Sequence, residues 1–157
     1  MQQVILEKKI LSKILKFRND VLAVIVFGSF VYMGRGRDID LVVIVKDYNI
    51  DPIKDSIDLR MYINKCLGYR VFTDIHVLTM DDFRNNLEIG SFLTGLALGY
   101  KILYDETGCL EKEIIAFLKK VSRSNYVLVN KYGKWSLRHH AKIMLRRKRV
   151  EIEEMNG

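Results

Sequence analysis

The chain lacks any apolar run long enough to cross a bilayer. Its longest run, Val21–Phe27, has 7 residues, whereas a membrane-spanning helix needs about 20. The first stretch, "MQQVILEKKILSKILK", scatters lysines through an amphipathic pattern and has no cleavage site of small residues. We therefore expect it to form a helix of the mature protein and not a signal peptide, and we expect no membrane association.

Cysteine is scarce as well. The 157 residues include only Cys66 and Cys109, which stand in no CxxC or other metal-ligand spacing. Isolated cysteines are typical of thiols in a reducing compartment, so we expect a cytoplasmic protein. An internal repeat, a low-complexity tract and an evident linker are also missing. The length then predicts one domain, or one domain with an appendage.

The charge is unevenly distributed along the chain. The formal net charge is +7, but the segment Lys131–Arg149 alone holds eight Lys and Arg and no acidic residue. The rest of the chain has 18 basic and 19 acidic residues. The basicity is therefore a local feature of the C-terminus and carries no information about the remaining surface.

Apolar periodicity predicts an α/β or α+β fold in which helices flank one mixed β-sheet. Strands are expected at about residues 20–27, 38–45, 69–79 and 101–105. Helices are expected at about residues 5–17, 52–67, 80–98, 109–121 and 132–154, and Gly90 is expected to interrupt the third of them. We expect residues 1–108 to form a core and residues 109–157 to form a C-terminal helical extension that packs on or beside it.

Two aspartates stand at the start of one expected strand, in "FGSFVYMGRGRDIDLVVIV". Because residues two apart share a strand face, Asp38 and Asp40 project side by side while Ile39 points the other way. Carboxylates about 5–7 Å apart repel each other unless a cation lies between them. Hard oxygen ligands suit Mg²⁺ or Mn²⁺, and Mg²⁺ recruits substrate phosphates as further ligands. The pair thus predicts a divalent metal and a phosphorylated substrate.

Gly28 and Ser29 come directly after the preceding expected strand. Glycine lets backbone N–H groups approach an anion closely, and serine adds a hydroxyl donor. A phosphate cradle and a metal site would then meet at one end of two strands. The alternative is that Asp38 and Asp40 cap a strand and pair with nearby arginines.

The segment "FGSFVYMGRGRDIDLVV" resembles the signature of the DNA polymerase β-type nucleotidyltransferase superfamily, in particular its small single-domain prokaryotic members, the minimal nucleotidyltransferases. The resemblance implies a polymerase-β-like fold. It implies that Asp38 and Asp40 bind two Mg²⁺ ions and that Gly28 and Ser29 hold the phosphates of an NTP, with ATP expected. Asp74, in "VFTDIHVL", matches the third catalytic carboxylate, which ligates one metal and helps to deprotonate the attacking hydroxyl. The implied reaction moves an NMP from the NTP to a hydroxyl acceptor and releases pyrophosphate.

The sequence departs from the family pattern in the spacer before the first aspartate. The eight residues between Ser29 and Asp38 make a shorter spacer than in many members, and Arg37 stands where serine is frequent. Arg35 and Arg37 either bind phosphate or pyrophosphate, which guanidinium groups suit, or belong to a solvated turn.

Two other features leave alternatives open. His76 either orients the substrate or is a half-buried strand histidine. The final expected helix has an apolar stripe beside a basic one. The basic stripe either binds nucleic-acid phosphates or an acidic partner, or is a solvated face beside an apolar homodimer or domain contact, and we favour the solvated face. Alternative functions are therefore a nucleic-acid-end-modifying enzyme or, as the resemblance implies, an antitoxin-like partner of a helical nuclease-type toxin. The basic residues of this helix include Arg138, Lys142, Arg146, Arg147, Lys148 and Arg149.

Overall fold

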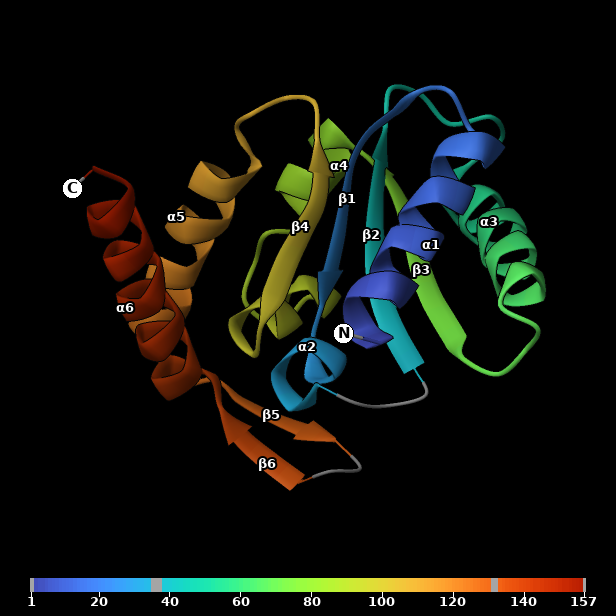
Figure 1. The fold of residues 1–157 in the computed structure, drawn as a ribbon. Helices are drawn as coiled ribbons and strands as arrows, with labels where there is room; N and C mark the ends of the chain where they lie inside the picture. The colour runs from blue at the N-terminus through green and yellow to red at the C-terminus, as the bar shows by residue number, and fades with distance from the viewer. Residues whose placement is uncertain (1, 35–37, 131–132, 157) are drawn as a thin grey trace.

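The chain folds around a mixed four-stranded sheet that lies between two layers of helices (Figure 1). A computed structural model describes residues 2–34, 38–130 and 133–156. The strands stand in the order β3-β2-β1-β4; β2 and β3 are parallel, and the other neighbours are antiparallel. The expected fold class is therefore confirmed. The four strands are β1 (Val21–Phe27), β2 (Asp38–Val45), β3 (Phe72–Thr79) and β4 (Tyr100–Asp105).

One face of the sheet is covered by α1 (Gln2–Phe17) and α3 (Pro52–Cys66), whose apolar side chains form a single cluster with that face. β1 and β2 are nearly continuous apolar runs because helices cover both of their faces. The start of α3 follows from its sequence. The Asp51 carboxylate accepts a 2.7 Å hydrogen bond from the N–H of Lys54, and a proline occupies the first helical turn.

The other face is covered by the later helices, which share a second hydrophobic cluster with the sheet. Since that cluster runs from Ala23 and Val42 to Leu137 and Ala141, the C-terminal helices pack directly on the sheet. The division of the chain at residue 108 stays a prediction. These helices are α4 (Met80–Asn85), the 3-10 helix η1 (Phe92–Ala97), α5 (Leu110–Ser122) and α6 (Leu137–Asn156). Within the described part of the chain, none of the helices combines the length and the apolar character of a membrane span.

One helix prediction is confirmed and another was wrong in part. The segment 80–98 is helical with an interruption at Gly90, as expected: it forms α4 and η1, and Gly90 lies between them with a φ of 97°, a conformation that interrupts a helix. The final helix begins at Leu137, because the segment before it forms a β-hairpin of β5 (Val127–Asn130) and β6 (Gly133–Ser136). In Figure 1 this hairpin extends below the sheet, near the short helix α2 (Ser29–Met33).

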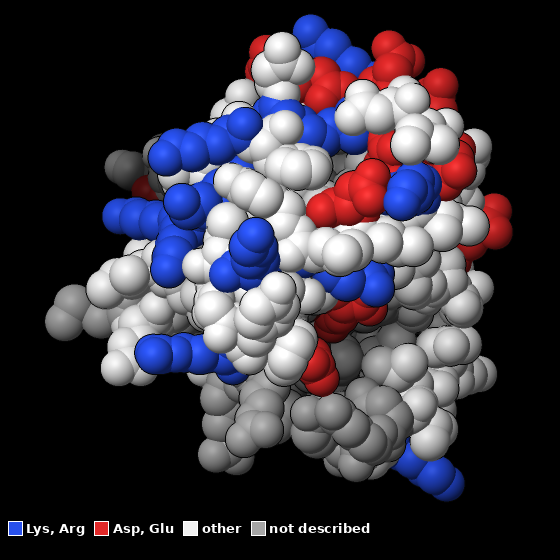
Figure 2. All heavy atoms as spheres, turned by 90° about the vertical axis from the view of Figure 1, so that its right-hand side faces the viewer, with Lys and Arg blue, Asp and Glu red and all other residues white. Residues whose placement is uncertain are grey.

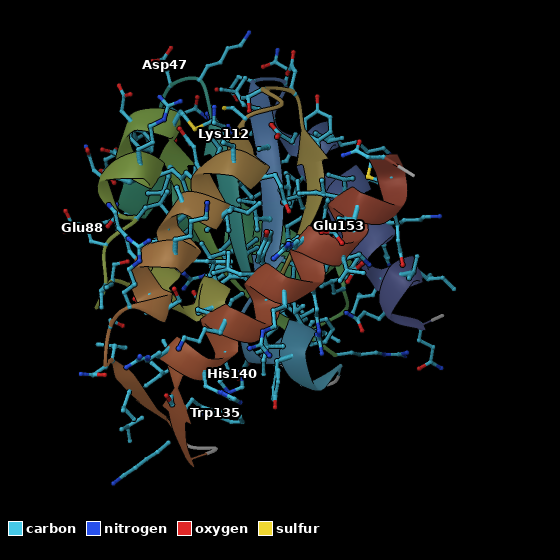
Figure 3. The ribbon with its side chains drawn as sticks, turned by 90° about the vertical axis from the view of Figure 1, so that its left-hand side faces the viewer. Asp47, Glu88, Lys112, Trp135, His140 and Glu153 are labelled. Atoms are coloured by element: carbon cyan, nitrogen blue, oxygen red, sulfur yellow. The ribbon has the colours of Figure 1, made fainter. Side chains whose placement is uncertain are left out.

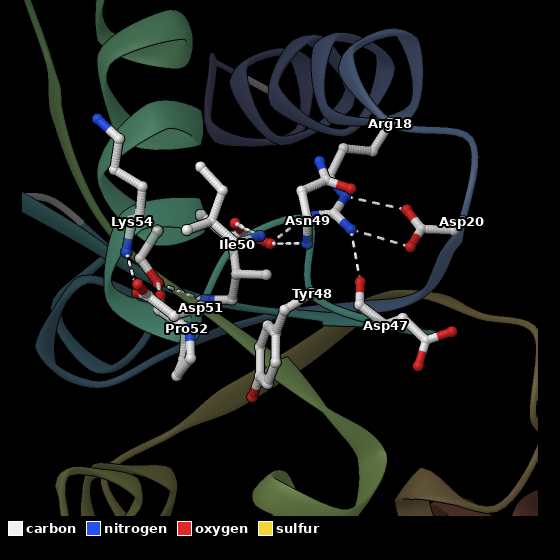
Figure 4. A network of polar contacts seen from close by, with 12 residues as sticks. Arg18, Asp20, Asp47, Tyr48, Asn49, Ile50, Asp51, Pro52 and Lys54 are labelled. Carbon is white, nitrogen blue, oxygen red and sulfur yellow. Dashed lines mark hydrogen bonds and ion pairs between the residues drawn. The ribbon is translucent and has the colours of Figure 1, made fainter.

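A buried polar network fixes the end of the sheet where β1 begins and β2 ends (Figure 4). Arg18 is 7% exposed, and its guanidinium lies 2.9 Å from a carboxylate oxygen of both Asp20 and Asp55. Asp55 also accepts hydrogen bonds from the N–H groups of Asn49 and Ile50. Burial alone would raise the pKa of Asp55, but these backbone bonds and Arg18 hold the pKa below its ordinary value. The network joins the α1–β1 turn to the start of α3.

Candidate active site

The opposite end of the sheet carries the aspartates that the sequence singled out. Asp38 and Asp40 lie at the start of β2, and Ile39 between them is 1% exposed, as strand alternation requires. β2 and β3 run in parallel with Asp40 directly opposite Asp74 in the register. Side chains on adjacent strands at such a position point to the same face. The fold therefore brings Asp74 beside Asp40.

The negative charges of Asp38 and Asp74 act on Asp40. Partial burial, followed by the negative charges of Asp74 and Asp38, raises the pKa of Asp40 to about 6. Like charges shift a pKa this way only when they lie close together. Among the described residues, however, no three His, Cys, Asp or Glu side chains stand close enough to hold one metal ion as they are placed.

Asp74 has a partner of opposite charge in another element. Its Oδ1 atom lies 2.7 Å from Nη2 of Arg60. Arg60 belongs to α3, on the opposite face of the sheet, so its side chain reaches around the edge strand β3, where it also contacts the carbonyl oxygen of Ile75 at 3.4 Å. Sequence reasoning missed Arg60, because no spacing rule connects a helix residue to a carboxylate on the next strand.

Gly28 occupies the turn that the sequence predicted to approach a phosphate. Its φ is 83° and its ψ is −154°, and a Cβ placed there would lie 2.9 Å from Oδ2 of Asp40. The N–H of Gly28 donates to the carbonyl of Gly99 at 2.9 Å, so it is not available to a ligand. The donors that can face an anion are the N–H groups of the first turn of α2, which have no partner within the helix. The Ser29 side chain, Arg35 and Arg37 lie outside the described residues.

A cleft of about 210 Å³ opens in front of Asp40 and Asp74. His76 and Phe92 form part of its wall, with stacked rings whose centroids are 4.2 Å apart. Leu128, from the β5–β6 hairpin, adds an apolar side chain to the same cleft. Sequence reasoning missed both residues: it expected a helix at Phe92 but not its contact with His76, and it did not expect the hairpin that carries Leu128.

His76 is half-buried, and its Nε2 lies 3.7 Å from Oδ2 of Asp74. Burial lowers the pKa of His76; the charge of Asp74 opposes this effect and that of Arg60 adds to it. The imidazole is therefore neutral near pH 7. The neutral imidazole carries no charge. One of its nitrogens can donate a hydrogen bond and the other can accept one.

An aromatic cluster connects α2 to the hairpin and to α6. The ring of Tyr32, on α2, lies 5.4 Å from that of Trp135 and 5.1 Å from that of His140, both in edge-to-face contact. Trp135 and His140 are 5.7 Å apart and lie at the end of β6 and the start of α6 (Figure 3). The short helix α2, which follows the glycine turn, therefore packs against β6 and α6.

The paired aspartates at the start of β2 and the glycine turn before α2 are the features that the sequence predicted for a nucleotidyl-transferring class of protein. Comparison with protein families agrees: the family described as "Nucleotidyltransferase domain" matches residues 8–150. The chain belongs to this family and is a nucleotidyltransferase, which confirms the resemblance seen in the sequence. Among curated proteins, no sequence matches the chain.

Solved structures that match the chain include chains of toxin–antitoxin complexes. A chain in the complex of the tri-AMPylated Shewanella oneidensis HEPN toxin with an MNT antitoxin is 16% identical, with a TM-score of 0.49 and full coverage of both chains. A chain of a toxin–antitoxin structure with AMP-PNP is 15% identical, with a TM-score of 0.49 and coverage of 96% of this chain and 98% of that one. Identities and scores this low transfer no substrate or partner to this chain.

Proposed function

We propose that the protein transfers an NMP from an NTP, with ATP expected, to a hydroxyl acceptor and releases pyrophosphate in a reaction that depends on Mg²⁺. The acceptor oxygen attacks the α-phosphorus, the bond from that phosphorus to the β-bridging oxygen breaks, and the acceptor proton passes to Asp74. Family membership supports the reaction class. The NTP, the metal and the residue roles are our proposals.

The donor set fits a hard divalent cation. Asp38 and Asp40 supply carboxylate oxygens from one strand face, and Asp74 can supply another if it leaves Arg60. Burial and, after it, the charges of Asp74 and Asp38 raise the pKa of Asp40, and a cation bound between these carboxylates would favour the ionised form of Asp40. A bound ion would neutralise the charge of the triphosphate during the displacement.

The other groups of the site would bind and orient the substrate. The N–H groups at the start of α2 and the hydroxyl of Ser29 would hold the terminal phosphates. Arg35 and Arg37 would contact phosphate or pyrophosphate, and this assignment stays a prediction. The cleft wall of His76 and Phe92 would exclude water beside the reacting phosphate.

The observation that carries this proposal is the register that places Asp40 opposite Asp74, next to the glycine turn. The test is to incubate the protein with each α-³²P-labelled NTP, Mg²⁺ and a cell extract. We expect one macromolecule or metabolite to become labelled, and we expect labelling to disappear with EDTA and with Asp40→Asn. Labelling that persists in a folded Asp40→Asn variant would contradict the assignment.

A protein partner is the second candidate, and one surface favours it over nucleic acid. The cleft of about 450 Å³ between α5 and α6 is lined mainly by aliphatic groups, including Ile115, Leu145 and Ile152. The basic residues beside it are partly neutralised, since Lys148 lies 3.0 Å from Glu111 and the Arg149 side chain pairs with a glutamate on its own helix. These two ion pairs would have to be given up before Lys148 and Arg149 could bind phosphates. The antitoxin-like role, the nucleic-acid role and the location in the cytoplasm stay predictions.

A further inference from the structure

Polar side chains of α3 follow the outer edge of β3, which is an edge strand of the described sheet. The Oγ atom of Ser56 accepts a 2.9 Å hydrogen bond from the N–H of Val77. Two turns further along the helix, Oδ1 of Asn64 accepts a 2.8 Å hydrogen bond from the N–H of Thr73. These bonds satisfy backbone groups that an edge strand leaves open, and they hold α3 against the strand at two points.

Arg60 lies midway between these two anchors, one helical turn from each. Its guanidinium makes a long contact, of 3.4 Å, with the carbonyl oxygen of Ile75 and a short one, of 2.7 Å, with Oδ1 of Asp74. Within the described part of the chain, the Nε atom of Arg60 is buried and has no hydrogen-bond partner. The short contact therefore ties Arg60 to the carboxylate that matches the third catalytic one.

Asp74 is not placed as a metal ligand while this contact is made. Its Oδ1 atom contacts Arg60, and its Oδ2 atom lies 3.7 Å from Nε2 of His76. Asp40 is its neighbour in the register, but as the described side chains stand, no three acidic, histidine or cysteine groups gather closely enough to hold one ion. The Asp74 side chain therefore has to turn before it can join Asp38 and Asp40 around a cation.

We propose that Arg60 is a positioning residue that competes with a divalent cation for Asp74. Asp74 is paired with Arg60 in the metal-free protein and becomes available to the cation only when that pair opens. Because Ser56 and Asn64 hold α3 in place, the exchange requires movement of two side chains and not of the helix. This proposal rests on the metal site of the proposed function.

The exchange has a small energetic cost because the pair is open to solvent. The side chains of Arg60 and Asp74 are 38% and 50% exposed. The helix α3 lies on the side of the molecule shown in Figure 2, where acidic and basic side chains stand next to one another at the surface. Ion pairs exposed to this extent change an equilibrium by about two- to fivefold. Loss of the pair should strengthen cation binding by that factor, since binding then no longer has to break it.

The opposite result is expected if Arg60 instead supports a metal-bound Asp74 from behind. Groups that hydrogen-bond to metal ligands in this way strengthen metal binding, and their loss costs about 10- to 100-fold in affinity. The direction of the change in affinity therefore separates competition from support.

The first test is the affinity for Mn²⁺, measured from the EPR signal of free Mn²⁺ without nucleotide or acceptor. Arg60→Met should lower the Kd about two- to fivefold. Ser56→Ala is the matched control: it removes a bond between the same helix face and β3, so it should lower the Tm and leave the Kd unchanged. In an Asp74→Asn background, Arg60→Met should have no effect, because the carboxylate that it would release is absent.

Three results would overturn the role of Arg60. They are an unchanged Kd in Arg60→Met, a higher Kd in that variant, and an equal gain in the Asp74→Asn background, which would reflect only the loss of a nearby positive charge. A wild type that binds no Mn²⁺ would overturn the metal site of the proposed function as well. The labelling assay decides the transfer reaction separately, since the Mn²⁺ measurement involves no turnover.

The second test leaves Arg60 in place. The buried Nε–H group of Arg60 gives a ¹H–¹⁵N NMR signal, which should shift as Mg²⁺ is added to the wild type and saturate together with the backbone signals of Asp38 and Asp40. Asp74→Asn should shift the same signal without Mg²⁺, because it removes the charge that Arg60 pairs with. A signal that stays unchanged at saturating Mg²⁺ would overturn the proposal.

Discussion

Replacement of Gly28 by alanine should have two effects that can be measured separately: backbone strain, which lowers the stability of the fold, and displacement of the Asp40 carboxylate, which lowers the rate of transfer. Gly28 has a φ of 83° and a ψ of −154°, a region that is nearly restricted to glycine and costs another residue about 1–3 kcal/mol. For a chain of this size that cost corresponds to a fall in Tm of roughly 2–12 °C. The new methyl group would also lie 2.9 Å from Oδ2 of Asp40. A short side chain can rotate away from such a contact, so we expect the carboxylate to move while the fold survives.

A displacement of about 1 Å in a reacting group can reduce the rate on the order of 100-fold, so transfer of labelled NMP should fall at least that far in Gly28→Ala. Gly68→Ala is the matched control, because Gly68 also has a positive φ, of 64°, but a methyl group there would meet no described atom within 4 Å beyond its own chain neighbours. It should lower Tm similarly and leave transfer intact. The reasoning is refuted if folded Gly28→Ala transfers as fast as the wild type, or if both variants lose activity equally.

Three further predictions concern pH, the buried network and a spectroscopic signal. Because the pKa of Asp40 is raised in the folded state, the metal-free protein should lose stability as the pH rises from 3.8 to about 6. Asp40→Asn should remove that loss. A wild type and an Asp40→Asn variant whose Tm values depend equally on pH would contradict this prediction. Arg18→Ala should lower the free energy of unfolding by about 3–5 kcal/mol in urea at pH 7, since it strands a buried carboxylate. The lowered pKa values of Asp20 and Asp55 give the wild type a stabilisation that fades as the pH falls below 3.8, so the gap to the variant should narrow in acid. Mg²⁺ with an NTP should change the fluorescence of Trp135, the only tryptophan, because Tyr32 on α2 contacts its ring; an unchanged spectrum at saturation would count against ligand binding beside α2.

The parts of the fold that were predictable are those with strong local signals. The apolar runs of β1 and β2, the cap at Asp51 and the proline after it define their elements without reference to the rest of the chain. The hairpin also left a signal, since Leu128 packs inward while Val127 and Val129 are exposed, the two-residue period of a strand. The nearby basic residues and the long helix after it obscured that period.

For the candidate site, the grouping of the aspartates was predictable from the sequence, but their partners were not. Two carboxylates on one strand face follow from spacing alone, and the approach of Asp74 required only that two strands be neighbours. The ion pair of Asp74 with Arg60 depends on how α3 lies over the edge of the sheet, and the bond from Gly28 to Gly99 depends on the approach of β4. Both are tertiary contacts between distant segments, which no local pattern records.

The central claim is that Asp38, Asp40 and Asp74 hold divalent cations beside the glycine turn. The most direct measurement is the anomalous scattering of Mn²⁺ in crystals grown with Mn²⁺ and a non-hydrolysable NTP analogue. The account predicts a Mn²⁺ peak at the carboxylates of Asp38 and Asp40, with Asp74 released from Arg60 and the triphosphate at the start of α2. Nucleotide bound elsewhere, or an ion-free site in which Asp74 still pairs with Arg60, would contradict the account.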